Sequence, residues 1–128
     1  MDLIEQIKQN ARENRQRIVL PEGDEARTLK AADQLIADGI ADVILIGPEQ
    51  TIKDMAAEFG LKNIDKATIV DPKNNPDRDK YANLLFEIRK SKGMTMEQAQ
   101  ELAENFMYLG VLMLKAGDAD GLVSGARS

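Results

Sequence analysis

Residues 39–47, which read Gly-Ile-Ala-Asp-Val-Ile-Leu-Ile-Gly, give the clearest indication of the architecture. Residues 41–47 form an almost continuous apolar run, which is typical of a strand that is buried on both faces. Gly39 comes two positions before this run and predicts the end of a helix. A second run of this kind, Arg17-Ile-Val-Leu-Pro21, lies upstream. We therefore expect strands of a parallel sheet, with helices between them.

The same pattern continues in both directions along the chain. Four strands are expected, over residues 17–21, 41–47, 67–70 and 120–124. Apolar residues at helical spacing predict five helices, over residues 2–14, 25–38, 50–59, 78–92 and 95–116, with a loop over 73–79. This alternation predicts an α/β protein, with residues 1–128 in one three-layer αβα unit around a mostly parallel sheet.

Single residues refine these boundaries. Asp24 is a candidate N-cap for the helix over 25–38, and Thr95 with Gln98 matches a capping box. Gly110 lies inside the last expected helix, where glycine costs about 1 kcal/mol relative to alanine. We expect close approach of a neighbouring element to compensate for that cost. Gly121, within the last strand, indicates close approach of another backbone or of a ligand.

Composition excludes several kinds of chemistry. The 128 residues include no cysteine and no histidine, so disulfides, thiol nucleophiles, histidine acid–base catalysis and the usual zinc sites are not expected, and no metal site is predicted. The net charge of −5 disfavours binding to nucleic acid. Residues 1–17 carry charges throughout, which fits neither a signal peptide nor a membrane span. We expect a cytoplasmic protein with no membrane contact.

The candidate binding residues follow the last expected strand. In an open parallel sheet, ligands bind outside the carboxyl ends of the strands. Ser124 and Gly125 come at this place, and a glycine bend there can expose backbone amides to an anion. Arg89 could bind a phosphate, although composition alone favours a solvated basic helix end. Glu22 could line the same cleft or belong to an ordinary turn.

Four stretches, in this order, resemble the phosphate acetyltransferase (phosphotransacetylase) family. They are residues 18–23 (Ile-Val-Leu-Pro-Glu-Gly) with Arg27-Thr28-Leu29, residues 39–47, residues 87–95 around Glu87-Ile88-Arg89-Lys90, and residues 119–126 (Ala-Asp-Gly-Leu-Val-Ser-Gly-Ala). The resemblance covers essentially the whole chain, and the last stretch is the most distinctive.

This resemblance implies the amino-terminal part of a two-domain, usually dimeric enzyme that transfers an acetyl group between coenzyme A and phosphate. Coenzyme A and acetyl-CoA, phosphate and acetyl phosphate would be substrates, and no permanently bound cofactor is implied. Arg89 matches an arginine that binds substrate, most simply a coenzyme A phosphate. Ser124 and Gly125 match the turn that approaches acetyl phosphate, and Ser128 falls where the family often has histidine.

The family's catalytic residues match positions beyond Ser128, so no catalytic residue is expected within these 128 residues and the isolated chain is expected to be inactive. Three alternatives stay open: a phosphate butyryltransferase, a non-catalytic module that binds coenzyme A or another anion, and an interaction domain that docks a partner on the apolar face of residues 99–114. A similar domain also ends some malic enzymes. An incomplete domain would expose apolar surface, which favours a homo-oligomer.

Overall fold

The computed structural model describes residues 16–123. It contains one sheet of four parallel strands in the order β3-β2-β1-β4. The strands are β1 (Gln16–Leu20), β2 (Ala41–Ile46), β3 (Thr68–Val70) and β4 (Gly121–Leu122). The helices are α2 (Ala26–Ala37), α3 (Glu49–Glu58), α4 (Arg78–Arg89), α5 (Met96–Ala103) and α6 (Phe106–Lys115), with short 3-10 turns η1 (Ile64–Lys66) and η2 (Lys90–Lys92). The expected helix over residues 2–14 lies outside the described residues.

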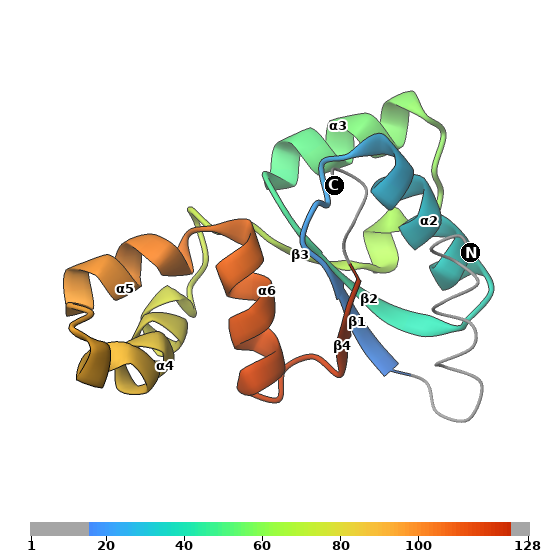
Figure 1. Cartoon of the computed structure of the whole chain (residues 1–128). Coiled ribbons are helices and arrows are strands. Elements are labelled where there is room, and N and C mark those ends of the chain that lie inside the picture. Colours follow the sequence, from blue (N-terminus) through green and yellow to red (C-terminus); the bar gives the residue numbers. More distant parts are fainter. Residues whose placement is uncertain (1–15, 124–128) are drawn as a thin grey trace.

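Side chains of the central strands alternate between the two faces of the sheet, and both faces are buried under helices. Ile18 and Leu45 pack with α2 and α3 in one cluster, whereas Val19 and Ile44 pack with α4, α5 and α6 in a second cluster. Figure 1 shows these helices on opposite sides of the sheet. The three-layer αβα fold expected from the sequence is therefore confirmed.

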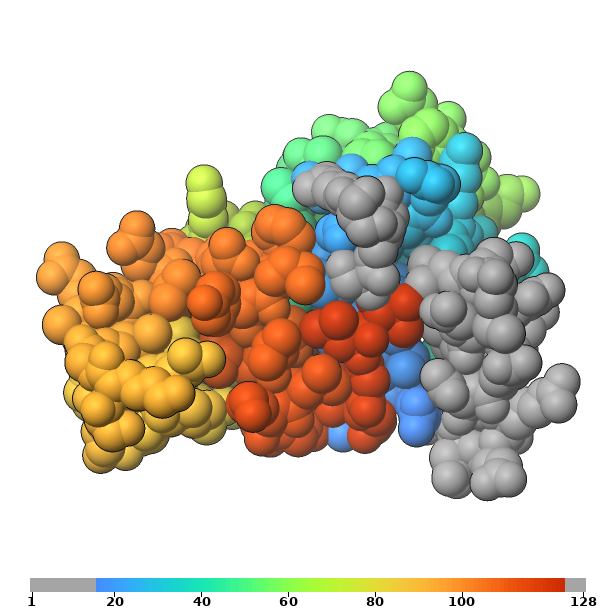
Figure 2. All heavy atoms as spheres, in the orientation of Figure 1, coloured from blue at the N-terminus to red at the C-terminus, as the bar shows by residue number. Residues whose placement is uncertain are grey.

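α6 covers the second face of the sheet, and α4 and α5 pack against α6. In Figure 1, α4 and α5 form a hairpin that extends away from the sheet, so the turn between them is remote from the strands. In the space-filling view, the orange-red residues of α6 and β4 lie next to each other on this face (Figure 2). The apolar residues of the 99–114 segment are divided: Ala99, Leu109 and Leu112 are buried, while Met107 and Val111 are exposed.

The prediction of a single helix over residues 95–116 is wrong, because the helix is interrupted at Asn105. The Asn105 side chain accepts hydrogen bonds from the amides of Met107 (2.9 Å) and Tyr108 (3.2 Å), and it thereby caps a new helix. α5 ends one residue earlier, at the C-cap Glu104. The apolar period runs through this break, which is why the periodicity alone suggested one helix.

The other helix ends agree more closely with the sequence. Thr95 and Gln98 form the expected capping box, with both reciprocal hydrogen bonds present. The cap of α2 is Glu25 rather than the expected Asp24, because the Glu25 carboxylate accepts a hydrogen bond from the Thr28 amide at 3.0 Å. The longer side chain caps from one position further along the chain.

Gly110 allows α6 to lie very close to the sheet. A Cβ atom at this position would be 2.8 Å from the Leu122 Cδ1 atom and 3.2 Å from the Pro21 Cγ atom. The close approach expected for Gly110 is confirmed. At Gly121, a Cβ atom would come nearest to Ile18 Cδ1, at 3.1 Å, which is a side-chain atom of the neighbouring strand and not a backbone atom.

Candidate functional site

The carboxyl ends of the strands meet at one edge of the sheet, because all four strands are parallel. Backbone hydrogen bonds tie the loops together at this edge. The Gly23 amide donates to the Ile46 carbonyl at 2.9 Å, and the Gly47 amide donates to the Val70 carbonyl at 3.0 Å. This carboxyl edge is where the topology predicts a ligand.

A pocket of about 520 Å³ opens at the carboxyl edge. Loops that follow β1, β2 and β3 line it, together with the start of α6. Its lining includes Pro21, Ile46, Gly47, Asp71, Lys73 and Phe106. The pocket therefore brings together parts of the chain that are far apart in the sequence.

The charged groups of this pocket do not favour a phosphate by themselves. Asp24, Asp71 and Glu104 contribute carboxylates, and Lys73 contributes an ammonium group. The Asp71 carboxylate accepts a hydrogen bond from the Lys73 amide at 3.0 Å. The first amides of α6 are already satisfied by Asn105, so they offer no open anion site. An anion at this edge needs additional donors.

The opposite end of the β1–β4 pair is held by Arg17 and Asp120. The Arg17 guanidinium donates to both Asp120 carboxylate oxygens, Nε to Oδ2 and Nη2 to Oδ1, each at 3.1 Å. The same guanidinium donates to the Gly117 carbonyl at 2.8 Å. The hydrogen bonds from Arg17 hold the pKa of Asp120 down at about 2, and Asp120 in turn raises the pKa of Arg17.

A second group of side chains holds the same loop from α4. The Tyr81 hydroxyl donates to Asp118 Oδ2 at 2.5 Å, and Lys80 Nζ donates to the same oxygen at 2.6 Å. Lys80 and then Tyr81 lower the pKa of Asp118, while burial and the bond to Asp118 raise the pKa of Tyr81. The loop that leads from α6 into β4 is thus attached to β1 on one side and to α4 on the other.

The structure places only one of the predicted binding residues. Arg89 is the last residue of α4; it is exposed, and it does not line the pocket at the carboxyl edge. Because Arg89 ends α4, it belongs to the turn that is remote from the sheet (Figure 1). Ser124, Gly125 and Ser128 lie outside the described residues. The binding roles of all four residues stay predictions.

Glu22, considered above as a cleft residue, is buried at 6% exposure directly after β1. Its carbonyl accepts a hydrogen bond from the Glu25 amide at 3.0 Å, so it belongs to the turn that starts α2. Glu22 does not line the pocket at the carboxyl edge. The turn interpretation therefore describes its place better.

Sequence reasoning missed the attachment of the 117–120 loop. Arg17 resembles a solvated cation, and Tyr81 resembles one apolar position of a helix. The sequence holds one signal. Ile18 pairs with Gly121 in the parallel strands, and Arg17 and Asp120 are the residues that directly precede them. This signal becomes visible only when the pairing of the strands is known.

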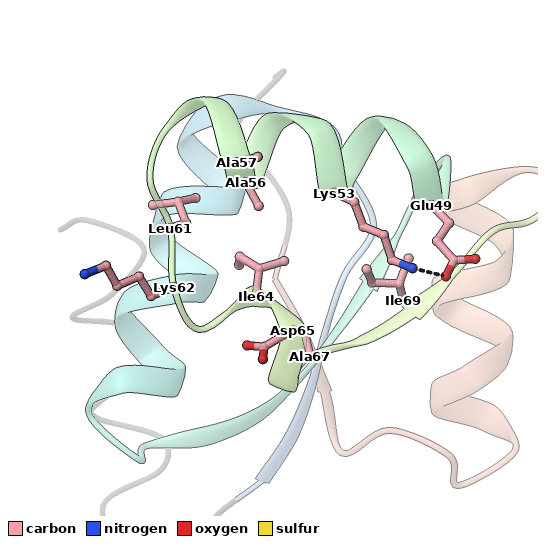
Figure 3. Close-up of a pocket in the computed structure, with 10 residues that line it drawn as sticks. All are labelled: Glu49, Lys53, Ala56, Ala57, Leu61, Lys62, Ile64, Asp65, Ala67 and Ile69. Carbon is pink, nitrogen blue, oxygen red and sulfur yellow. Dashed lines mark ion pairs between the residues drawn. The ribbon is translucent and has the colours of Figure 1, made fainter.

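A second pocket, of about 560 Å³, lies between α3 and the edge strand β3. Figure 3 shows its apolar floor, including Ala56, Ile64 and Ile69, and the ion pair between Lys53 and Glu49 at its rim. That ion pair has an N–O distance of 2.9 Å, so each charge is matched locally. The pocket shares no lining residue with the one at the carboxyl edge.

Within residues 16–123, no group of three or more acidic residues could hold a metal ion. In the same part of the chain, no helix has the length and apolar character needed to cross a membrane.

The fold and its carboxyl edge define an open parallel α/β domain of the kind that binds ligands where its strands end. The family model described as "Phosphate acetyl/butaryl transferase" matches residues 2–128, and the chain belongs to this family. The phosphate acetyltransferase of Thermoanaerobacterium thermosaccharolyticum is 50% identical over 126 residues, and that of Clostridium acetobutylicum is 44% identical over 126 residues. Each match covers 98% of this chain and 38% of the relative.

Solved structures agree with this assignment. The EutD phosphotransacetylase from Staphylococcus aureus superposes with a TM-score of 0.84 at 36% identity, over 97% of this chain and 37% of that one. A phosphotransacetylase from Streptococcus pyogenes gives a TM-score of 0.86 at 30% identity, over 100% of this chain and 39% of that one. The chain therefore spans somewhat less than two fifths of the length of these relatives.

Proposed function

We propose that this chain serves as the amino-terminal α/β part of a phosphate acetyltransferase, which catalyses acetyl-CoA + phosphate = CoA + acetyl phosphate. The observation that carries the proposal is the family match over residues 2–128, together with 50% identity to a phosphate acetyltransferase. The enzyme's substrates are small anions and coenzyme A, and the net charge of −5 argues against a nucleic-acid substrate. Because coenzyme A is an intracellular substrate, the cytoplasm is the proposed location.

In this proposal, the chain positions substrates and supplies no catalytic base. Ser124, Gly125 and Ser128 contact the phosphate group of acetyl phosphate, and Arg89 contacts a phosphate of coenzyme A. Amides and arginines at such a site stabilise charge that develops on the acyl oxygen and on the leaving phosphate. A base deprotonates the coenzyme A thiol, and the thiolate then attacks the acetyl carbonyl. We assign that base to a second domain across a cleft, in a homo-oligomeric enzyme.

A chimeric enzyme tests the proposal. This chain replaces the matched 126-residue segment of the T. thermosaccharolyticum phosphate acetyltransferase. The chimera is expected to form acetyl-CoA from acetyl phosphate and coenzyme A, and the chain alone is expected to form none. A folded chimera without acyl transfer contradicts the proposal, as does turnover by the chain alone.

A further inference from the structure

We propose that Arg17 and Asp120 are positioning residues for the acyl-phosphate site, because the ion pair between them fixes the register of β4, the strand that leads to Ser124. This inference rests on the proposed function, and it concerns residues that lie at the opposite end of β4 from the site. Neither side chain touches a substrate. Both act through the strand.

β4 has few bonds of its own to fix its place. Its pairing with β1 comprises two residue pairs, Ile18 with Gly121 and Val19 with Leu122. The register of so short a strand is weakly specified by the ladder alone. Additional bonds from its ends are needed to select one pairing.

Arg17 and Asp120 supply those bonds at the amino end. The Asp120 amide donates to the Arg17 carbonyl at 2.8 Å, and the Arg17 amide donates to Asp120 Oδ2 at 2.8 Å. The two guanidinium–carboxylate bonds are added to these backbone bonds. A planar guanidinium that meets both carboxylate oxygens has one preferred geometry, so it specifies position as well as charge.

Leu122 supports the same register from the side of α6. The Leu122 Cδ1 atom packs directly against Gly110. A Cβ atom added to Gly110 would be 2.8 Å from it. A slip of one residue would turn Leu122 to the other face of the sheet and would empty the space next to Gly110. The ion pair and the packing of Leu122 therefore select one and the same alignment.

The consequence for the proposed site is geometric. The Val123 amide donates to the Val19 carbonyl at 3.1 Å, and Ser124 follows one peptide bond later. A slip of one residue would move the end of β4 at Val123, from which the chain continues to Ser124, by about 3.3 Å along the strand direction. Displacements of about 1 Å can cost a hundredfold in rate, so the register of β4 determines whether the turn can meet the acyl phosphate.

The exposure of the pair separates this role from a purely stabilising one. The Arg17 and Asp120 side chains are 46% and 39% exposed. Exposed ion pairs contribute little to stability. Loss of the pair should therefore disturb the position of β4 more than it disturbs the folded state.

The test uses the active chimera with the variants Arg17→Gln, Asp120→Asn, their combination and Arg17→Lys. Lys53→Gln is the matched control, because it also removes a cation from an exposed ion pair, on α3. We expect KM for acetyl phosphate to rise roughly tenfold in both single variants, with KM for coenzyme A nearly unchanged. The double variant should be no worse than either single one, Arg17→Lys should be intermediate, and Lys53→Gln should match the parent.

If KM for acetyl phosphate is unchanged in both single variants, the inference is overturned. The proposed function is judged separately, by the activity of the parent chimera. A fall in kcat alone, in proportion to a loss of folded protein, overturns it as well. If the parent chimera is inactive, the proposed function fails. Hydrogen exchange in the chain itself then tests whether the ion pair fixes the register of β4. Faster exchange of the Val123 amide in Arg17→Gln supports the fixing of the register, and unchanged exchange contradicts it.

Discussion

At the scale of single residues, acidic side chains of the 117–120 loop act as fixed points for β4. Asp118 meets Tyr81 and Lys80 from α4, and Asp120 meets Arg17 from β1. These contacts favour the ionised carboxylates, because the donors are cations or a hydroxyl group. The strength of these contacts must therefore depend on pH.

Asp120→Asn is expected to destabilise the chain only slightly at neutral pH, because the ion pair is exposed, and not at all in strong acid. The folded pKa of Asp120 is about 2, below the ordinary value of about 3.9. Its ionised form therefore stabilises the fold above about pH 4, and this contribution is lost as the pH falls from about 4 towards 2. Urea unfolding of both proteins across this range measures the difference in free energy, and a difference that stays constant would rule out the ion pair as its source.

Arg89→Ala in the chimera is expected to raise KM for coenzyme A by roughly ten- to a hundredfold, the loss that corresponds to one hydrogen bond between charged groups. Steady-state kinetics at fixed ionic strength measure it. Lys92→Ala removes a cation from the same exposed turn and is the matched control. Equal effects of the two substitutions would show that only the general positive charge of this turn matters.

At the scale of elements, α6 connects the sheet with the hairpin of α4 and α5. Leu109, Gly110 and Leu112 face the sheet, and α4 and α5 pack against α6 within the same cluster. The absence of a side chain at Gly110 is what allows this helix to approach Leu122 and Pro21 so closely. The place of β4 under α6 follows from this contact.

Gly110→Ala is expected to destabilise the chain by about 1 kcal/mol. Alanine improves the helix by about 1 kcal/mol, but forced overpacking costs typically 1–3 kcal/mol. The new Cβ atom would meet Leu122 Cδ1 at 2.8 Å and the Pro21 ring at 3.2 Å. Chemical denaturation measures the change. In a Leu122→Ala background the same substitution should be neutral or stabilising, and an equal loss in both backgrounds would exclude this contact as the cause.

At the scale of the whole molecule, patterns that depend on near neighbours in the sequence predicted the fold well. The apolar runs at 17–21 and 41–47 became the buried strands β1 and β2, and the resemblance to the phosphate acetyltransferases holds over residues 2–128. Asn105 was missed because its neighbours keep a helical apolar period, although asparagine is a favoured N-cap.

The contact between Arg17 and Asp120 could not be predicted in the same way. The two residues are 103 positions apart, and nothing local distinguishes either from an ordinary surface charge. Their meeting depends on which strands become neighbours and in which register, and this is decided by the packing of the whole domain. The predicted turn at Ser124 and Gly125 falls outside the described residues, so its role stays a prediction.

The initial rate of acetyl-CoA formation by the purified chimera is the decisive measurement for the proposed function. We expect a kcat in the usual enzymatic range of roughly 1–1,000 s⁻¹ with acetyl phosphate and coenzyme A as substrates. We also expect no turnover by the chain alone or by the remainder of the T. thermosaccharolyticum enzyme alone. A chimera that folds and associates like the parent enzyme but forms no acetyl-CoA would show that this chain is not the amino-terminal part of such an enzyme.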